Sequence, residues 1–104
     1  MEKLYDIKEE QERVILVGVC TNEHDDTMES LDELKDLVKT AGAIPLEIVV
    51  QNRESIHPGT YIGKGKIEEL RQRVIELNAT GIVCDDELSP AQLKNLEDEL
   101  DTKV

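Results

Sequence analysis

The residues best suited to chemistry are two lysines set among glycines: Gly63, Lys64, Gly65 and Lys66, in the stretch GTYIGKGKIEEL. Glycine-rich turns with a lysine ahead of a helix are a common means of holding phosphate. A P-loop needs Gly, four residues, Gly-Lys and then Ser or Thr, and no register of this stretch supplies all of them. Two interpretations stay open: a tight turn with solvated lysines, or an anion or RNA-phosphate contact at a helix N-terminus.

Asp85 and Asp86 are the acidic residues best placed for a ligand, because they directly follow an expected strand. Open α/β sheets bind ligands at the carboxyl ends of their strands, and clustered carboxylates there suit Mg²⁺. A solvated loop before a capped helix is the simpler interpretation, which we favour because no further ligands are visible. His24 and His57 stand alone in polar loops, without a second ligand at metal-binding spacing. The sequence therefore predicts neither catalytic residues nor a metal site in this chain.

One segment of the chain differs from the rest in its net charge. The 24 acidic and 12 basic residues give a net charge of −12, which opposes binding to phosphate backbones. Between Arg53 and Arg73, however, bases outnumber acids, so an anion-binding face is expected there, with Arg53 as a weaker candidate. Aromatic residues are limited to Tyr5 and Tyr61, which leaves few stacking platforms for single-stranded nucleic acid.

Length and composition set the class of protein. A chain of 104 residues suits one domain with one core. No apolar run approaches the roughly 20 residues that span a bilayer, and the charged start MEKLYDIKEEQER lacks the apolar core of a signal peptide. Cys20 and Cys84 each end an apolar run, which favours buried thiols in a reducing cytosol over a disulfide. The expectation is a cytoplasmic domain without a membrane span.

Strands and helices alternate along the chain. Strands are expected at residues 13–19, 44–51, 60–62 (a short one) and 81–84, and Lys103-Val104 looks like the opening of another. The pattern predicts an α/β fold: a single domain with a mainly parallel twisted sheet of about four strands and three helices packed on its faces. Residues 1–12 form a charged N-terminal lead, and the domain covers residues 13–104.

Each helix is expected from its caps and its apolar stripe. The first is predicted to begin with the capping pair Asp26 and Glu29, to end at Gly42, and to bury Met28, Leu31, Leu34, Leu37, Val38 and Ala41. The second is predicted to begin at Lys66, to end near Asn78 and to bury Ile67, Leu70, Val74 and Leu77. Arg71 and Arg73 flank that stripe, with Glu69 and Arg73 as an i,i+4 pair. The third is predicted to start from Ser89, Pro90 and Gln92, and to bury Leu93, Leu96 and Leu100.

Three stretches together resemble one known family. ESLDELKDLVKTAGA (29–43), TYIGKGKIEEL (60–70) and CDDELSPAQLKNLE (84–97) are similar, in order and spacing, to the N-terminal domain of the HflX family of GTPases. The resemblance runs from about Arg13 to Val104. It implies a cytoplasmic protein that associates with the large ribosomal subunit and splits or rescues ribosomes.

The resemblance also implies that different domains of such a protein have different functions. GTP and Mg²⁺ would bind in a separate GTPase domain that follows a helical hairpin, and none of these parts lies in this sequence. The present domain would be non-catalytic: it would pack on and modulate the GTPase domain and contact ribosomal RNA. Gly63, Lys64, Gly65 and Lys66 are the residues we assign to that contact. The alternative is a stand-alone α/β domain that binds a small anionic ligand between Gly63–Lys66 and Asp85–Ser89, at the carboxyl edge of the sheet.

Overall fold

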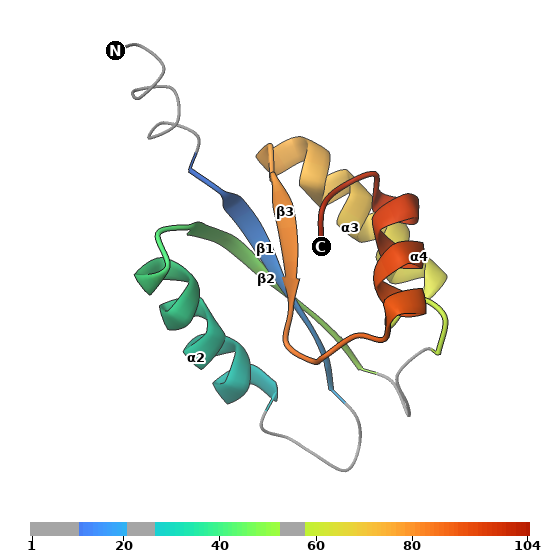
Figure 1. Ribbon diagram of the computed structural model, residues 1–104, viewed down its shortest axis with the longest axis horizontal. Coiled ribbons are helices and arrows are strands. Elements are labelled where there is room, and N and C mark those ends of the chain that lie inside the picture. Colours follow the sequence, from blue (N-terminus) through green and yellow to red (C-terminus); the bar gives the residue numbers. More distant parts are fainter. Residues whose placement is uncertain (1–10, 21–26, 53–57) are drawn as a thin grey trace.

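The α/β prediction is confirmed by the fold (Figure 1). The computed structural model describes residues 11–20, 27–52 and 58–104. The elements are β1 (Arg13–Cys20), α2 (Thr27–Thr40), β2 (Ile44–Asn52), α3 (Lys64–Leu77), β3 (Gly81–Cys84) and α4 (Pro90–Leu100). The predicted strands at the positions of β1, β2 and β3 are thus confirmed, as are the three helices. None of the helices in the described ranges is both long and apolar enough to cross a membrane.

The sheet has the order β2-β1-β3, and both pairings are parallel. β1 is the central strand and is buried on both faces, which explains its unbroken run of apolar residues. Val14 and Leu16 face α2, whereas Ile15, Val17 and Val19 face α3 and α4. The described residues therefore form three layers, with α2 on one face of the sheet and α3 and α4 on the other (Figure 1).

Helix α2 buries a narrower stripe than the sequence pattern predicts. Leu31 and Val38 are buried, but the side chains of Met28 and Leu37 are 50% and 66% exposed, and Ala41 is exposed as well. A helix packed against one sheet face covers positions about 3.6 residues apart, so residues beside that line turn to solvent. The helix ends at Thr40, and the predicted glycine beyond its end, Gly42, has a φ of +95°, which suits glycine. The predicted cap Asp26 lies outside the described residues.

The predicted short strand at residues 60–62 is reduced to a single β-bridge at Tyr61. Tyr61 has a φ of +73°, in the left-handed region, and the Ile62 N–H donates to the Thr60 carbonyl oxygen at 2.7 Å. A hydrogen bond between residues two apart defines a γ-turn, which reverses the chain, so the pairing at Tyr61 does not extend into a strand. The described part of the sheet consequently has three strands, against the four or so expected from the pattern.

The C-terminal part of the chain follows the prediction closely. Helix α3 begins at Lys64, two residues earlier than expected, and α4 begins with the predicted capping box between Ser89 and Gln92. Leu96 and Leu100 are buried, but Leu93 is 38% exposed, so its expected place in the core is wrong. After α4, Lys103 forms a parallel bridge with Gly81 at the open edge of β3, where the pattern places the start of a further strand.

Candidate functional site

The glycine-lysine motif is the boundary between the γ-turn and α3. Gly63 is the N-cap residue and is buried, and its N–H donates to Oε1 of Gln51 at 2.9 Å. Lys64 and Gly65 are exposed, while Lys66 is partly buried and its Nζ lies 3.3 Å from Glu69 Oε1. Of the four residues predicted to contact an anion, Lys64 and Gly65 are therefore the most accessible.

The backbone at the start of α3 favours negative charge. The first intrahelical acceptor is the Gly63 carbonyl, which receives the N–H of Ile67. The N–H groups of residues 64–66 precede that bond, and no side chain at Gly63 caps them. A side chain added at Gly65 would meet no atom within 4 Å, so the space beside the Gly65 Cα is open. A phosphate could approach the helix end at that position.

Most of the positive charge on α3 is engaged inside the domain. Arg71 and Arg73 both form ion pairs, Arg71 with Glu68 and Glu99 and Arg73 with Glu47 and Glu76. The predicted pair between Glu69 and Arg73 is wrong, because Glu69 binds Lys66 instead. Within the described ranges, Lys64 is the base of this helix for which no ion pair is found.

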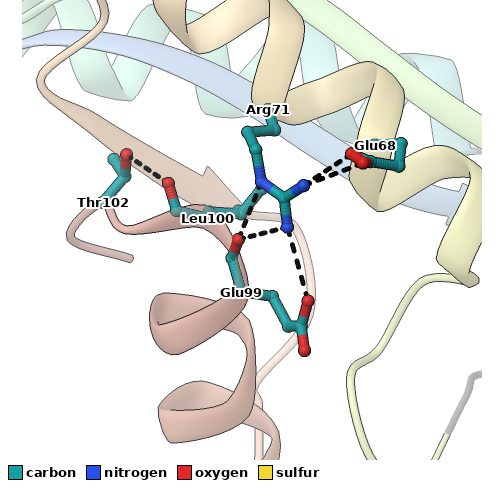
Figure 2. Close-up of polar contacts among 5 residues, drawn as sticks. All are labelled: Glu68, Arg71, Glu99, Leu100 and Thr102. Carbon is teal, nitrogen blue, oxygen red and sulfur yellow. Dashed lines mark hydrogen bonds and ion pairs between the residues drawn. The ribbon is translucent and has the colours of Figure 1, made fainter.

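Arg71 joins α3 to the end of α4 (Figure 2). Its Nε and one terminal nitrogen donate to the Glu99 carbonyl oxygen at 3.0 and 2.6 Å, and its other terminal nitrogen lies 2.5 Å from Glu68 Oε1. A cation at the last carbonyls of a helix is favourable because those groups carry the negative end of the dipole. Arg71 is thus a link between two helices. Its charge is already shared by Glu68 and a helix end.

Asp85 and Asp86 each accept a hydrogen bond from a different element. Asp85 Oδ1 accepts from the Ser30 hydroxyl of α2 at 3.0 Å, and Asp86 Oδ2 accepts from the Tyr61 hydroxyl at 2.7 Å. No group of three His, Cys, Asp or Glu side chains suited to a metal occurs in the parts of the chain that are described. These two aspartates connect the loop after β3 to its surroundings. The other weak candidate, Arg53, lies outside the described residues.

Tyr61, Gln51 and Asn95 are site residues that the sequence does not reveal. Each takes part in a hydrogen bond that holds the segment 59–63. The Tyr61 hydroxyl donates to Asp86, and Gln51 accepts from the Gly63 N–H. Asn95 Nδ2 donates to the Gly59 carbonyl oxygen at 2.9 Å. The segment is thereby tied to the end of β2, to the loop after β3 and to α4. A tyrosine beside glycines resembles an ordinary turn residue, so only the fold shows that its side chain is buried.

Two hollows border these residues, and they are separate. One of about 300 Å³ adjoins Lys64 and is lined also by Glu68, Arg71 and Glu99. The other, of about 550 Å³, follows the open edge of β3 and includes Asp86 and Leu88. The Tyr61 side chain reaches across to Asp86 between the glycine-lysine motif and this loop. Neither of these two hollows is lined by both Gly63–Lys66 and Asp85–Ser89, so neither is the expected crevice.

Comparison with known proteins gives a consistent result. A family model described as "GTP-binding GTPase N-terminal" matches residues 28–104. A relative from Lacrimispora saccharolytica named "GTPase HflX" is 66% identical over 104 residues, which is all of this chain and 25% of that protein. Proteins of the same name from Caldanaerobacter subterraneus and Escherichia coli are 41% and 34% identical over 99 and 94 residues, or 23% and 22% of their lengths. The chain thus spans about a quarter of the curated relatives it matches.

Proposed function

The chain belongs to the HflX family of GTPases, as a domain from the N-terminal part of such a protein, and from this we propose that it binds the large ribosomal subunit. The contact is with ribosomal RNA, through Lys64, Gly65 and Lys66 at the start of α3, with Gly63 as their buried support. In this proposal the domain is non-catalytic and cytoplasmic. It packs on the GTPase domain of the same protein, modulates it, and so takes part in splitting or rescuing ribosomes.

The observation that carries the proposal is the combination at residues 64 and 65. Lys64 is exposed and forms no ion pair with any described residue, and Gly65 leaves the helix end open. A cation with no ion pair among the described residues, beside amides that no side chain caps, favours an anion such as phosphate, because both place positive charge at the helix start. Phosphates are what ribosomal RNA presents on its surface.

The contact we propose is with the RNA backbone rather than with its bases. Sequence-specific recognition of RNA usually stacks splayed bases on aromatic rings. Tyr61 is the aromatic residue within the described ranges, and its side chain is only 1% exposed. A domain without an accessible ring can still hold phosphates, which gives position and orientation more than sequence specificity. The net charge of −12 then restricts binding to this one small area.

GTP and Mg²⁺ are assigned to the GTPase domain, because the residues of this chain do not fit them. Every register of the glycine-lysine stretch lacks a P-loop position, so the hydroxyl that would reach Mg²⁺ is missing. Asp85 and Asp86 already accept hydrogen bonds from Ser30 and Tyr61. The small hollow beside Lys64 is lined by Glu68 and Glu99 as well as Arg71, which disfavours the alternative of a free anionic ligand there.

Replacing Lys64 and Lys66 by alanine in the full-length protein tests the proposal. Co-sedimentation with large ribosomal subunits at several salt concentrations should show weaker binding, and the slope of log affinity against log salt should fall by about one for each phosphate that is no longer neutralised. Lys35→Ala with Lys39→Ala is the matched control, since it removes the same charge from α2 on the opposite face of the sheet. Equal slopes for the two double variants would show that Lys64 and Lys66 are only solvated.

A further inference from the structure

We propose that Tyr61 is a positioning residue for this contact: its hydroxyl, held by Asp86, keeps the turn that presents Lys64 and Gly65 in one conformation. The inference rests on the proposed function, and it adds a residue that never touches the RNA. It links two motifs that lie apart in the sequence, the turn before α3 and the loop after β3.

Tyr61 has an unusual backbone conformation. A φ of +73° is rare for a residue with a bulky side chain, and a γ-turn with this sign of φ is the strained form. Such a conformation persists only where the surrounding structure over-determines it. Glycine would relieve the strain at this position, so tyrosine must be held there by its side chain.

The side chain of Tyr61 is anchored at both ends. Its ring belongs to the core cluster with Ile62, Ile67 and Leu70, and its hydroxyl donates to Asp86 Oδ2 at 2.7 Å. Burial, and next the hydrogen bond to Asp86, raise the pKa of Tyr61 above its ordinary value, so the hydroxyl keeps its proton and remains a donor. Asp86 itself is exposed, which means that water replaces the tyrosine if the bond is removed.

The chain between Tyr61 and the proposed contact at Lys64 is short and firmly held. Between Tyr61 and Lys64 stand only Ile62, which is fully buried, and Gly63, which is buried and bonded through its N–H to Gln51. The direction of the first turn of α3 therefore depends on where residues 61–63 are held. Without the hydroxyl, the strained turn loses one of its restraints and relaxed conformations gain population. Apparent affinity falls in proportion to the fraction of molecules that remain competent to bind.

Three substitutions in the full-length protein separate this role from general stability. Tyr61→Phe and Asp86→Ala both remove the hydrogen bond, and each should weaken binding to large ribosomal subunits by about three- to tenfold. Asp86→Asn keeps an acceptor oxygen and should restore most of the affinity. The combination of Tyr61→Phe with Asp86→Ala should cost no more than Tyr61→Phe alone, because Tyr61→Phe already breaks the bond that Asp86→Ala removes. Ser30→Ala is the matched control: it removes the neighbouring bond to Asp85, on the side of the loop that faces α2, and should leave affinity unchanged.

Hydrogen exchange gives a second measurement that does not depend on the ribosome. In Tyr61→Phe, the Gly63 amide should exchange several-fold faster while the Leu16 amide in the central strand keeps its rate, since only the turn is released. If Lys64→Ala with Lys66→Ala weakens binding and Tyr61→Phe does not, the positioning role is refuted and the proposed function stands. If neither change affects binding, the proposed function itself fails. A uniform acceleration of exchange throughout Tyr61→Phe would mean that the hydroxyl only stabilises the fold.

Discussion

The bases of α3 have two different roles at the scale of single residues. Arg71 and Arg73 fasten the helix to α4 and to β2, whereas Lys64 projects from its first turn. Arginine suits the first role because its planar fork can bind a carboxylate or a carbonyl through two N–H groups at once. The local composition predicts a basic segment, but it cannot assign these roles, because Glu47 and Glu99 are distant in the sequence.

The ion pair between Glu47 and Arg73 should make stability depend on pH. The hydrogen bond from Arg73 is the main cause that lowers the pKa of Glu47, against the opposing effect of partial burial. A carboxyl whose folded-state pKa is lowered contributes stability above its unfolded-state pKa, and that contribution is lost as the pH falls through the folded-state value. Glu47→Gln should therefore lower the free energy of unfolding at pH 7 by less than about 1 kcal/mol, and have a smaller effect near pH 3.

Urea unfolding of the chain at several pH values between 3 and 7 measures this dependence. Glu33→Gln is the control, since Glu33 is exposed on α2 and no ion pair is found for it among the described residues. Parallel curves for Glu47→Gln and the unmodified chain would show that the pair contributes nothing measurable.

Gly65 offers a change that should move stability and binding in opposite directions. It lies in the first turn of α3 with open space around it, so Gly65→Ala should stabilise the chain by about 0.4–1 kcal/mol. The added methyl group would stand where a phosphate approaches the helix end, so binding of the full-length protein to large subunits should weaken. Gly42→Ala is the opposite control: its φ of +95° makes alanine strained, which should lower the melting temperature without affecting binding. A Gly65→Ala variant that is more stable and binds normally would exclude close approach of the backbone to RNA.

Caps and periodicity explain why so many elements could be predicted from sequence. A continuous apolar run predicts strand β1, and the residues Ser89, Pro90 and Gln92 predict the start of α4. The sequence-based predictions are wrong where contacts between distant parts of the chain determine the local conformation. Residues 60–62 have strand-like composition, yet the core pocket for Tyr61 imposes a turn, and the sequence of α2 does not reveal how narrow its contact with the sheet is.

Ser89→Ala should weaken the start of α4. The Ser89 hydroxyl accepts from the Gln92 N–H at 3.1 Å, and the Gln92 side chain accepts from the Ser89 N–H at 3.0 Å. Loss of an N-cap of this kind costs about 1 kcal/mol, which thermal melts of the chain would detect as a fall of several degrees. Ser89→Asp retains a capping oxygen and should recover most of the loss. Ribosome binding lost by Ser89→Ala without any change in melting temperature would instead place Ser89 in a functional site.

At the scale of the whole molecule, the large negative charge bears on the contact proposed at the start of α3. At −12, long-range electrostatics repel RNA, so under the proposed function we expect this domain alone to bind ribosomal RNA weakly. Several weak contacts on one chain reinforce one another through effective concentration.

The isolated chain should not bind GTP. It supplies no P-loop register and no hydroxyl for Mg²⁺ in the glycine-lysine stretch. Calorimetric titration with GTP and Mg²⁺ should give no heat of binding at micromolar concentrations, whereas the full-length protein, used as the positive control, should bind. Micromolar affinity in the chain alone would overturn the assignment of the nucleotide site to another domain.

The parallel pairing of β1 with β3 affects how the chain folds while it is being translated. Arg13 at the start of β1 exchanges hydrogen bonds with Thr80, which is 67 positions away, so the central strand is translated long before its second neighbour. At roughly 5–20 residues per second, that delay lasts on the order of ten seconds. During this time an apolar strand that will be buried on both faces can pack only against α2, β2 and, later, α3, which precede β3 in the chain. The nascent chain therefore presents one open strand edge to chaperones and to other nascent chains until Gly81–Cys84 leave the exit tunnel.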